Sequence, residues 1–458
     1  MPPALAVPRC LTPTLGALLT CLLAAAPGRT DDWPQWLGPD RDGVWRETGL
    51  VARFPQGGPK LLWRVPVDAG YSGPAVAGGR VYLTDRQRAQ GADGKPLRAT
   101  RKGYPGNERV LCLAAADGKL LWKQEYDCSY KISYPSGPRT TPLVQGGRVW
   151  TLGAMGDLYC FDAGSGEVRW HKYLPEEYKT EEPLWGYAAH PLLDGGLLIT
   201  LAGGEGSAVV ALDKETGKEV WRALSSKEVC YSPPMIYEAG GKRQLIIWLS
   251  DSINGLDPAT GHPYWTVPYP VSGEPRRPAV NIATPRRLGE LLYVSSAYHG
   301  AVMLKLAADK PAAGMLWHGN SNQLEKPDGL HMLIPSPVLK DGHIYGINVD
   351  GGLLCLEAET GKQVWQTYEP LGGEKATFGT AFLVPQGDRF VICTDQGDLI
   401  LASLTPKGYK EIDRAHILEP TQESQGRKVV WSHPAFAGRC VFARNDKELV
   451  CVSLAEKE

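Results

Sequence analysis

The sequence lacks an excess of charge of either sign. Lysine and arginine together number 49, aspartate and glutamate 50, and no run of like charge extends beyond a few residues. A protein that follows a nucleic-acid backbone needs clustered positive charge on one face or along one segment. The charge distribution therefore argues against a nucleic acid as partner.

The sequence also lacks an apolar run long enough for a stable membrane span. The segment from Leu11 to Ala26 contains Pro13 and falls short of the roughly 20 residues that a transmembrane helix needs. It follows a single basic residue, Arg9, and ends in consecutive alanines, which is typical of a signal peptide and its cleavage zone. We therefore expect residues 1–29 to be a signal peptide and the mature protein to be periplasmic or secreted. An uncleaved anchor is the alternative.

Signatures of several kinds of chemistry are absent. The sequence has no Cys-x-x-Cys-His for an attached haem, no phosphate-binding loop, no Ser-His-Asp set and no cluster with metal-ligand spacing. Asp40 and Asp42 resemble the start of a calcium loop, but the later ligand positions are missing, so we interpret them as part of a turn. We predict no catalytic residues and no metal site.

Phenylalanine is scarce, with 7 residues, whereas glycine numbers 53, proline 37, tyrosine 19 and tryptophan 14. This composition is typical of many short strands that are joined by tight turns. We therefore expect no long helices.

One pattern recurs along the chain with a period of about fifty residues. Each copy has a hydroxyl or small residue and Pro, an apolar strand, Gly and a second strand, a third strand, a Thr-Gly-Lys-like turn, and Trp. The clearest copy runs from Thr141 to Trp170, and an equivalent copy runs from Ser336 to Trp365. A strand-rich repeat of this length indicates propeller blades or a solenoid. The copies, eight in all, begin at Pro74, Pro142, Pro191, Pro233, Pro285, Pro337, Thr380 and Pro434.

The two ends of the repeat array complement each other. The last copy stops at Leu454 without a fourth strand, whereas Trp63 stands before the first copy. We expect residues 60–65 to supply the outer strand of the final blade, which removes the exposed edges of an open array. The sequence predicts an all-β fold, an eight-bladed β-propeller over residues 60–458 that an N-terminal strand closes by completing the last blade. Residues 30–59 are expected to form an extended lead-in.

The tryptophan that ends most copies has a structural interpretation. Its apolar body is expected to wedge against the neighbouring blade, and truncating such a packed side chain costs about 3 to 5 kcal/mol. The copy after Thr380 has lost this residue. The docking tryptophans are Trp63, Trp122, Trp170, Trp221, Trp265, Trp317 and Trp365.

Eight cysteines follow the leader, and their placement argues against a disulfide framework. Four occupy one repeat position, where other copies carry Ala211, Gly255 and Ala402, so we interpret them as small core residues. Equivalent positions in different blades lie too far apart for a disulfide. These four are Cys112, Cys160, Cys355 and Cys451, and the pairing of Cys128, Cys230, Cys393 and Cys440 stays open.

Two segments resemble the tryptophan-docking repeat of quinoprotein-type propellers: Leu-Asp-Lys-Glu-Thr-Gly-Lys-Glu-Val-Trp at residues 212–221 and Glu-Ala-Glu-Thr-Gly-Lys-Gln-Val-Trp at residues 357–365. The lead-in Asp-Trp-Pro-Gln-Trp-Leu-Gly-Pro at residues 32–39 is similar to the start of bacterial PQQ-like repeat proteins. That family includes the scaffold lipoprotein of the outer-membrane β-barrel assembly machine. The resemblance covers nearly all of the mature chain and implies the propeller fold. It does not decide the function, because such repeats occur both in dehydrogenases and in proteins without a cofactor.

The resemblance also implies what a catalytic relative would need. In quinoprotein dehydrogenases, pyrroloquinoline quinone (PQQ) carries three carboxylates and lies over Ca²⁺ that Glu, Asn and Asp hold, with an Asp as base. The larger alcohol dehydrogenases have two adjacent cysteines over the cofactor, and this chain has no adjacent pair. Sugar-oxidising relatives can lack the pair. We predict no cofactor, and PQQ with calcium belongs only to the alternative.

Residues that break the symmetry of the repeat are the candidate binding residues, because a ring of equivalent positions places unlike side chains on one shared face. Arg139 near a channel mouth needs an anionic ligand or a carboxylate partner within the protein. For His190 and His433 the alternative is a hydrogen bond to neighbouring backbone. The candidates are Arg139, Trp185, His190, Tyr231, Asn281, His331 and His433, together with Tyr71 and the turn residues Tyr298 and His299.

The sequence thus favours an exported, non-catalytic propeller, expected to be a monomer, that binds a protein partner or a small ligand. A PQQ-dependent dehydrogenase-like oxidoreductase is the alternative. An insertion at residues 86–108, rich in Arg, Lys and Gly, is expected to form an exposed loop over one face.

Overall fold

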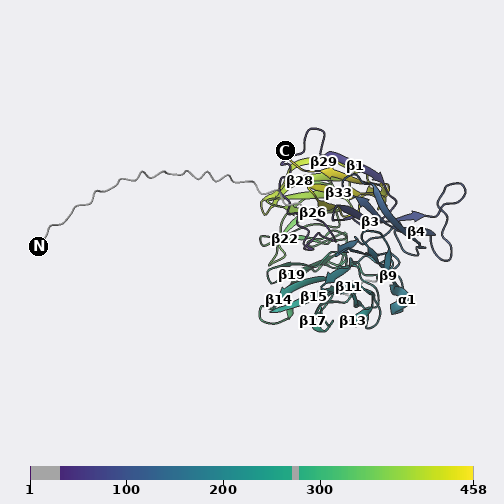
Figure 1. Ribbon diagram of the computed structural model, residues 1–458. Helices are drawn as coiled ribbons and strands as arrows, with labels where there is room; N and C mark the ends of the chain where they lie inside the picture. The colour runs from purple at the N-terminus through teal and green to yellow at the C-terminus, as the bar shows by residue number, and fades with distance from the viewer. Residues whose placement is uncertain (2–30, 271–277, 457–458) are drawn as a thin grey trace.

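The computed structural model describes Met1, residues 31–270 and residues 278–456. Over these residues it contains eight four-stranded sheets and one two-stranded sheet. The four-stranded sheets are the blades of a β-propeller, which confirms the all-β, eight-bladed fold that the repeat predicts (Figure 1). Apart from Met1, the expected signal peptide lies outside the described residues.

Seven blades are built from consecutive antiparallel strands. The fourth strand of each is on the outside of the ring and exposes much of its surface, whereas the second and third strands are almost wholly buried between neighbouring blades. The first four are blade 1 with β2 (Ala75–Ala77), β3 (Arg80–Arg88), β4 (Gly106–Ala114) and β5 (Leu120–Asp127); blade 2 with β6 (Leu143–Gln145), β7 (Arg148–Leu152), β8 (Asp157–Asp162) and β9 (Val168–Tyr173); blade 3 with β10 (Leu192–Asp194), β11 (Leu197–Leu201), β12 (Val209–Asp213) and β13 (Glu219–Ala223); and blade 4 with β14 (Met235–Ala239), β15 (Lys242–Trp248), β16 (Ser252–Leu256) and β17 (Pro263–Pro268). The next three are blade 5 with β18 (Arg286–Leu288), β19 (Leu291–Ser296), β20 (Gly300–Leu306) and β21 (Ala313–His318); blade 6 with β22 (Val338–Lys340), β23 (His343–Ile347), β24 (Leu353–Glu357) and β25 (Gln363–Thr367); and blade 7 with β26 (Ala381–Gln386), β27 (Arg389–Thr394), β28 (Asp398–Thr405) and β29 (Gly408–His416).

The eighth blade joins the two ends of the chain. Its inner strands are β32 (Ala435–Ala437), β33 (Cys440–Arg444) and β34 (Glu448–Ser453), and its outermost strand is β1 (Lys60–Pro66). β1 runs antiparallel to β34, with Trp63 opposite Cys451. Figure 1 shows β1, in purple, beside the yellow strands of the C-terminal end. The predicted closure of the ring by an N-terminal strand is therefore confirmed.

Glycine turns fix the register of the strands. Gly146 and Gly147 connect β6 to β7 and have φ values of +58° and +76°, so that Gln145 pairs with Arg148. A two-residue hairpin turn needs positive φ at both central positions, which glycine adopts without steric cost. The same pair of residues recurs as Gly78 and Gly79 in blade 1 and Gly240 and Gly241 in blade 4.

The docking tryptophans connect each blade to the next. Trp122 lies opposite the small Cys112 within blade 1, and its Nε1 donates a hydrogen bond of 3.0 Å to the carbonyl of Ala163 in blade 2. Its ring covers Gly166, where a Cβ atom would fall 2.6 Å from the indole. The corresponding indole hydrogen bonds run from Trp63 to Ala115, Trp170 to Lys214, Trp221 to Pro258, Trp317 to Ala358 and Trp365 to Thr405.

Trp265 departs from this arrangement. Its Nε1 donates to Oε1 of Gln244, 2.6 Å away in its own blade. The facing turn of blade 5 has Ala-Ala-Asp-Lys-Pro-Ala at residues 307–312, without the Thr-Gly that blades 3, 4 and 6 have in this turn. In blade 7, where the tryptophan is missing, Glu411 lies opposite Ala402.

The eight cysteines from Cys112 onward are buried, and each is a free thiol in the structure. Those at the shared repeat position lie opposite docking tryptophans, so their small size makes room for the indoles. The four cysteines whose pairing the sequence leaves open are also unpaired: Cys128, Cys230, Cys393 and Cys440.

Short elements complete the described part of the chain. They are the helix α1 (Leu174–Tyr178), the 3₁₀ turn η1 (Glu369–Leu371) and a hairpin of β30 (Gln422–Ser424) and β31 (Arg427–Val429) between blades 7 and 8. The described helices are all too short to cross a membrane. The predicted loop at residues 86–108 is shorter than expected, because residues 86–88 and 106–108 extend β3 and β4 and Arg86 and Glu108 are buried. The mostly exposed loop between these two strands projects from the ring (Figure 1).

Candidate ligand-binding cavity at the ring axis

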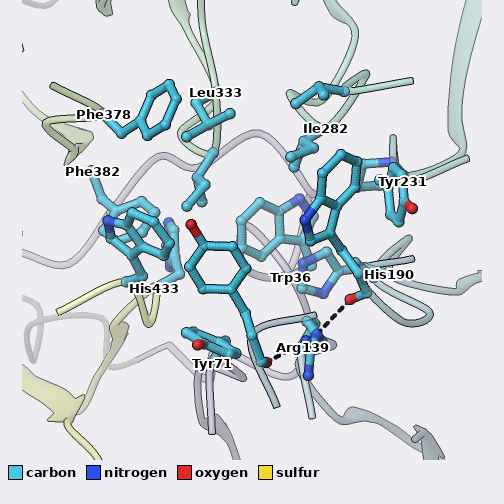
Figure 2. A pocket seen from close by; sticks show the side chains of 18 of the residues that line it. Trp36, Tyr71, Arg139, His190, Tyr231, Ile282, Leu333, Phe378, Phe382 and His433 are labelled. Atoms are coloured by element: carbon cyan, nitrogen blue, oxygen red, sulfur yellow. Dashed lines mark hydrogen bonds between the residues drawn. The ribbon is translucent and has the colours of Figure 1, made fainter. Parts of the chain in front are cut away.

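A cavity of about 360 Å³ lies on the axis of the ring. The segments that precede the first strands of all eight blades contribute to its wall, and Tyr298 joins them from the turn between β19 and β20. Figure 2 shows the side chains of these segments converging on one space. The wall is mainly aromatic and aliphatic, and none of the described residues that line it is an aspartate or glutamate.

Trp36 from the lead-in lies across the base of this cavity (Figure 2). Its indole stacks on the imidazole of His190 in blade 3, with ring centroids 3.9 Å apart and an interplanar angle of 9°. The same indole meets His433 of blade 8 edge-on and donates a hydrogen bond of 3.0 Å to Oγ1 of Thr284 at the start of blade 5. One side chain therefore contacts blades on different sides of the axis.

Arg41, also from the lead-in, is 5% exposed. Its guanidinium donates to the carbonyls of His190, Pro191 and Pro234, at 3.3, 2.9 and 3.3 Å. Burial lowers its pKa to about 10, which still leaves it charged at neutral pH. Arg286 in turn donates to the carbonyl of Arg41.

Residues 33–47, here called the plug, follow a path across the ring. Trp33 forms a bridge with Val76 in blade 1, and the amide of Trp45 donates to the carbonyl of Pro385 in blade 7. Glu47 is fully buried, and its carboxylate accepts hydrogen bonds from the Trp45 indole and from the amide of Arg439 in blade 8. The lead-in that the sequence predicts as an extended segment thus forms the base of the cavity.

The two histidines of the cavity are held by backbone. Nδ1 of His190 accepts a hydrogen bond of 2.9 Å from the amide of Thr141, and Nδ1 of His433 lies 2.6 Å from the carbonyl of Pro434. Burial lowers the pKa of His190 well below its ordinary value, with the charge of Arg41 adding to the effect. Burial lowers the pKa of His433 to about 4. Both rings are therefore neutral at pH 7.

Arg139 is partly buried in the cavity wall and is bound by carbonyl groups. Its Nε donates to Trp185 over 2.8 Å, and a terminal nitrogen donates to Tyr134 (Figure 2). The terminal nitrogens also donate to Ser133 and Gly137. The guanidinium also lies 5.1 Å from the ring centre of Tyr71. Among the described residues no carboxylate lies within ion-pair distance of Arg139, and its hydrogen-bond acceptors are backbone carbonyls, so an internal ion pair, the alternative that the sequence allowed, is not seen there.

The other sequence candidates divide into two groups. Trp185 and Tyr231 line the cavity with their rings in a T-shaped contact, and Tyr71 and Tyr298 also line it. Three candidates lie outside the lining. The side chain of Asn281 donates to the carbonyl of Leu249, that of His331 lies against Ala297 and Asp328, and the ring of His299 faces Tyr269.

Several lining residues are not among the candidates. They are Trp36, Tyr134, Phe378, Phe382 and Trp431, with aliphatic residues of blades 5 and 6. Trp36 had a visible signal, since the short segment before the first blade contains three tryptophans, Trp33, Trp36 and Trp45. Trp431 follows the hairpin β30–β31, which lies outside the repeat and has no counterpart in other blades.

The donor set does not fit PQQ with calcium. Ca²⁺ needs several oxygen ligands, of which carboxylates are the strongest, and three carboxylates on a cofactor need several cationic partners. The described lining residues include no carboxylate, one side-chain amide from Gln425 and one arginine. Among the described residues there is also no group of three or more His, Cys, Asp or Glu side chains that could hold a metal ion.

Comparisons with known proteins place the chain among propellers of one type. It is 22% identical to the outer membrane protein assembly factor BamB of Shewanella oneidensis over 267 residues, which cover 55% of this chain and 62% of that protein. It is 24% identical to BamB of Yersinia pestis over 276 residues, 57% of this chain and 65% of that protein. The match therefore spans less than two thirds of either relative. A quinoprotein ethanol dehydrogenase of Pseudomonas aeruginosa is 31% identical over 126 residues, which cover 27% of this chain and 18% of the enzyme.

Solved structures share the fold. BamB from Moraxella catarrhalis superposes with a TM-score of 0.54 at 17% identity and covers 87% of this chain and 98% of its own. The computationally designed protein Ika8 superposes with a TM-score of 0.52 at 12% identity and covers 86% of this chain and 99% of its own. A family model described as outer membrane protein assembly factor BamB matches residues 106–306 and 249–458, and it confirms the resemblance to PQQ-like repeats. Because these matches extend over well more than half of the sequence, the chain belongs to the family of outer membrane protein assembly factor BamB.

Proposed function

We propose that this chain is an exported, non-catalytic β-propeller that acts as a binding scaffold, with the axial cavity as its ligand site. The observation that carries the proposal is the wall of the cavity. Aromatic and aliphatic side chains from all eight blades surround it, and its described residues include no carboxylate. Such a wall binds by burying apolar surface, and pockets of this size accept a small molecule or one or two side chains of a partner.

The family supports the scaffold role. The relatives from Shewanella oneidensis and Yersinia pestis are named outer membrane protein assembly factors, a name that describes a role toward other proteins. By this proposal the chain enters the periplasm or leaves the cell after removal of residues 1–29, and its partner is a protein of the cell envelope. Cell fractionation with determination of the mature N-terminus tests the export step.

A neutral fluorescent probe tests the ligand site. We expect N-phenyl-1-naphthylamine, an uncharged aromatic compound, to bind the purified protein and to gain fluorescence. Ala188 lines the cavity with a small side chain, so the variant Ala188→Phe is expected to occupy part of the space and to weaken this binding about tenfold. Equal binding by wild type and Ala188→Phe, with unchanged circular dichroism, would contradict the assignment of the site.

The alternative function, that of a PQQ-dependent dehydrogenase, is tested directly. The protein is incubated with PQQ and Ca²⁺, dialysed, and examined for a retained chromophore and for dye reduction with ethanol and glucose. We expect neither, because the lining residues supply no ligand set for the metal and a single arginine for three carboxylates. Retained PQQ together with turnover would overturn the non-catalytic assignment.

A further inference from the structure

Two arginines flank the cavity, and the structure gives neither a carboxylate partner among the described residues. Arg139 is in the wall, and the buried Arg41 lies just outside it, where it donates to the carbonyl of the lining residue His190. The acceptors of Arg139 are backbone carbonyls, and Arg41 adds only the side-chain amide of Gln35 to its carbonyls. Carbonyl groups satisfy hydrogen bonds but carry no net charge, so none of these acceptors neutralises a guanidinium. The buried carboxyl of Glu108 acts on Arg139 only from beyond ion-pair distance, and burial raises the pKa of that carboxyl.

The remaining lining groups add no negative charge. His190 and His433 are neutral at pH 7, since burial lowers the pKa of both. Burial also raises the pKa of the Tyr71 hydroxyl, which stays protonated. The cavity is therefore an apolar space with a net positive charge, and a charge in such surroundings acts more strongly than it would in water.

The sign of this charge decides between two kinds of ligand. A wall of indole and phenol rings by itself suits organic cations, which bind to the faces of aromatic rings. Arg139 and Arg41 oppose that use, because a second cation in the same space would be repelled. An anion is attracted, and Arg139 has five N–H donors of which four are engaged by carbonyls, which leaves one for a ligand.

We propose that the axial cavity selects apolar small molecules that carry a single anionic group, such as aromatic or aliphatic monocarboxylates. The apolar body is buried against Trp36, Trp185 and Tyr231, and the anion lies at Arg139. A single arginine in the wall matches one negative charge and not three, which separates this ligand class from PQQ. The inference depends on the proposed function, because it names the ligand of the same cavity.

Two probes that differ by one anionic group test the inference. 8-Anilinonaphthalene-1-sulfonate has the ring system of N-phenyl-1-naphthylamine with one added sulfonate. We expect Arg139→Gln to weaken binding of the sulfonate about tenfold and binding of the neutral probe less than about twofold, because the variant removes charge and keeps most of the wall. Arg139→Lys is expected to keep the preference for the sulfonate. The matched control is Arg222→Gln, whose side chain is 58% exposed on the outer strand β13 and which is expected to change neither affinity.

Competition on the wild-type protein needs no variant. 2-Naphthoate is expected to displace N-phenyl-1-naphthylamine at concentrations about tenfold lower than 2-naphthamide, its neutral counterpart, and added salt is expected to reduce this difference. Equal competition by the acid and the amide, or stronger competition by a naphthylmethyl ammonium compound, overturns the inference and leaves the proposed function standing. Failure of both probes to bind, or binding that Ala188→Phe does not affect, removes the proposed ligand site itself.

Discussion

The indole of Trp36 lies parallel to the imidazole of His190, 3.9 Å from it between ring centres. Trp36 belongs to the plug and precedes the first blade, whereas His190 introduces β10 of blade 3. The contact therefore fixes a segment that is not part of any blade onto the axis of the ring. It also keeps His190 away from solvent, which is why its imidazole stays neutral.

Replacing Trp36 should destabilise the protein and open the base of the cavity. We expect Trp36→Ala to lower the free energy of unfolding by about 3 to 5 kcal/mol, because the buried indole loses its packing and its hydrogen bond to Thr284. Urea denaturation followed by circular dichroism measures the change. Trp36→Phe keeps a ring on His190 and loses only the N–H donor together with some contact area, so we expect a smaller loss of about 1 to 2 kcal/mol. Equal losses for the two variants would mean that the ring contact does not stabilise the plug.

The buried state of His433 predicts a dependence of stability on pH. Burial lowers its pKa from the ordinary value of 6.5 to about 4, so the folded state favours the neutral ring. This contribution is fully present above pH 6.5 and is lost as the pH falls from 6.5 toward 4. It corresponds to about 3 kcal/mol over that window. We expect His433→Gln to make this part of a plot of unfolding free energy against pH less steep, and the buried His190 to keep part of the slope, because burial lowers its pKa as well.

The control for His433 is a histidine outside the core. His262 is exposed in the turn before β17, and His262→Gln should leave the same plot unchanged. A wild-type plot that is flat between pH 6.5 and pH 4, or one that both variants alter equally, would contradict the assignment to the buried ring.

The repeat in the sequence predicted the ring because every blade has the same local requirements. Each blade needs apolar strands, a glycine turn and an indole that covers the next turn, and these recur in the sequence wherever a blade occurs. Closure was predictable for the same reason, since Trp63 lacks a blade of its own and the last copy lacks an outer strand. The position of Arg139, His190 and His433 at one end of the ring follows from their place before the first strands.

The base of the cavity was not predictable in this way. The plug has no repeat, and its path depends on single contacts with distant blades, such as Arg41 with the carbonyls of Pro191 and Pro234. Asn281 and His331 show the opposite case, because the sequence makes them candidates and the structure places them outside the lining of the cavity. They precede first strands as His190 does, but their side chains turn to nearby carbonyls instead of the axis. Position in the repeat fixes where a residue enters the ring, and packing fixes where its side chain points.

Two glycine-to-alanine substitutions distinguish the energetic cost of disturbing a docking tryptophan from the cost of backbone strain. Gly166 has φ +76°, and a Cβ atom there would lie 2.6 Å from the ring of Trp122 in the neighbouring blade. Gly146 has φ +58°, and a Cβ atom there meets nothing within 4 Å. We expect Gly146→Ala to cost about 1 kcal/mol from strain alone, and Gly166→Ala to cost about 2 to 4 kcal/mol because the indole must also move. Similar losses of unfolding free energy for the two variants in urea denaturation would indicate that the indole of Trp122 can move aside at little cost.

Truncation at the N-terminal side separates the plug from the closing strand. A chain that begins at Lys60 lacks the plug and keeps β1, whereas a chain that begins at Val67 lacks both. We expect the longer chain to fold with reduced stability, because the remaining blades still form a closed ring.

The shorter chain leaves β34 as an open edge and removes Trp63 from its contact with the carbonyl of Ala115 in blade 1. Every blade depends on its neighbours, so the loss should spread beyond blade 8, and we expect a broad, low-temperature melt by circular dichroism together with aggregation in gel filtration. A melting temperature for the Val67 chain equal to that of the Lys60 chain would show that the ring does not depend on its N-terminal strand.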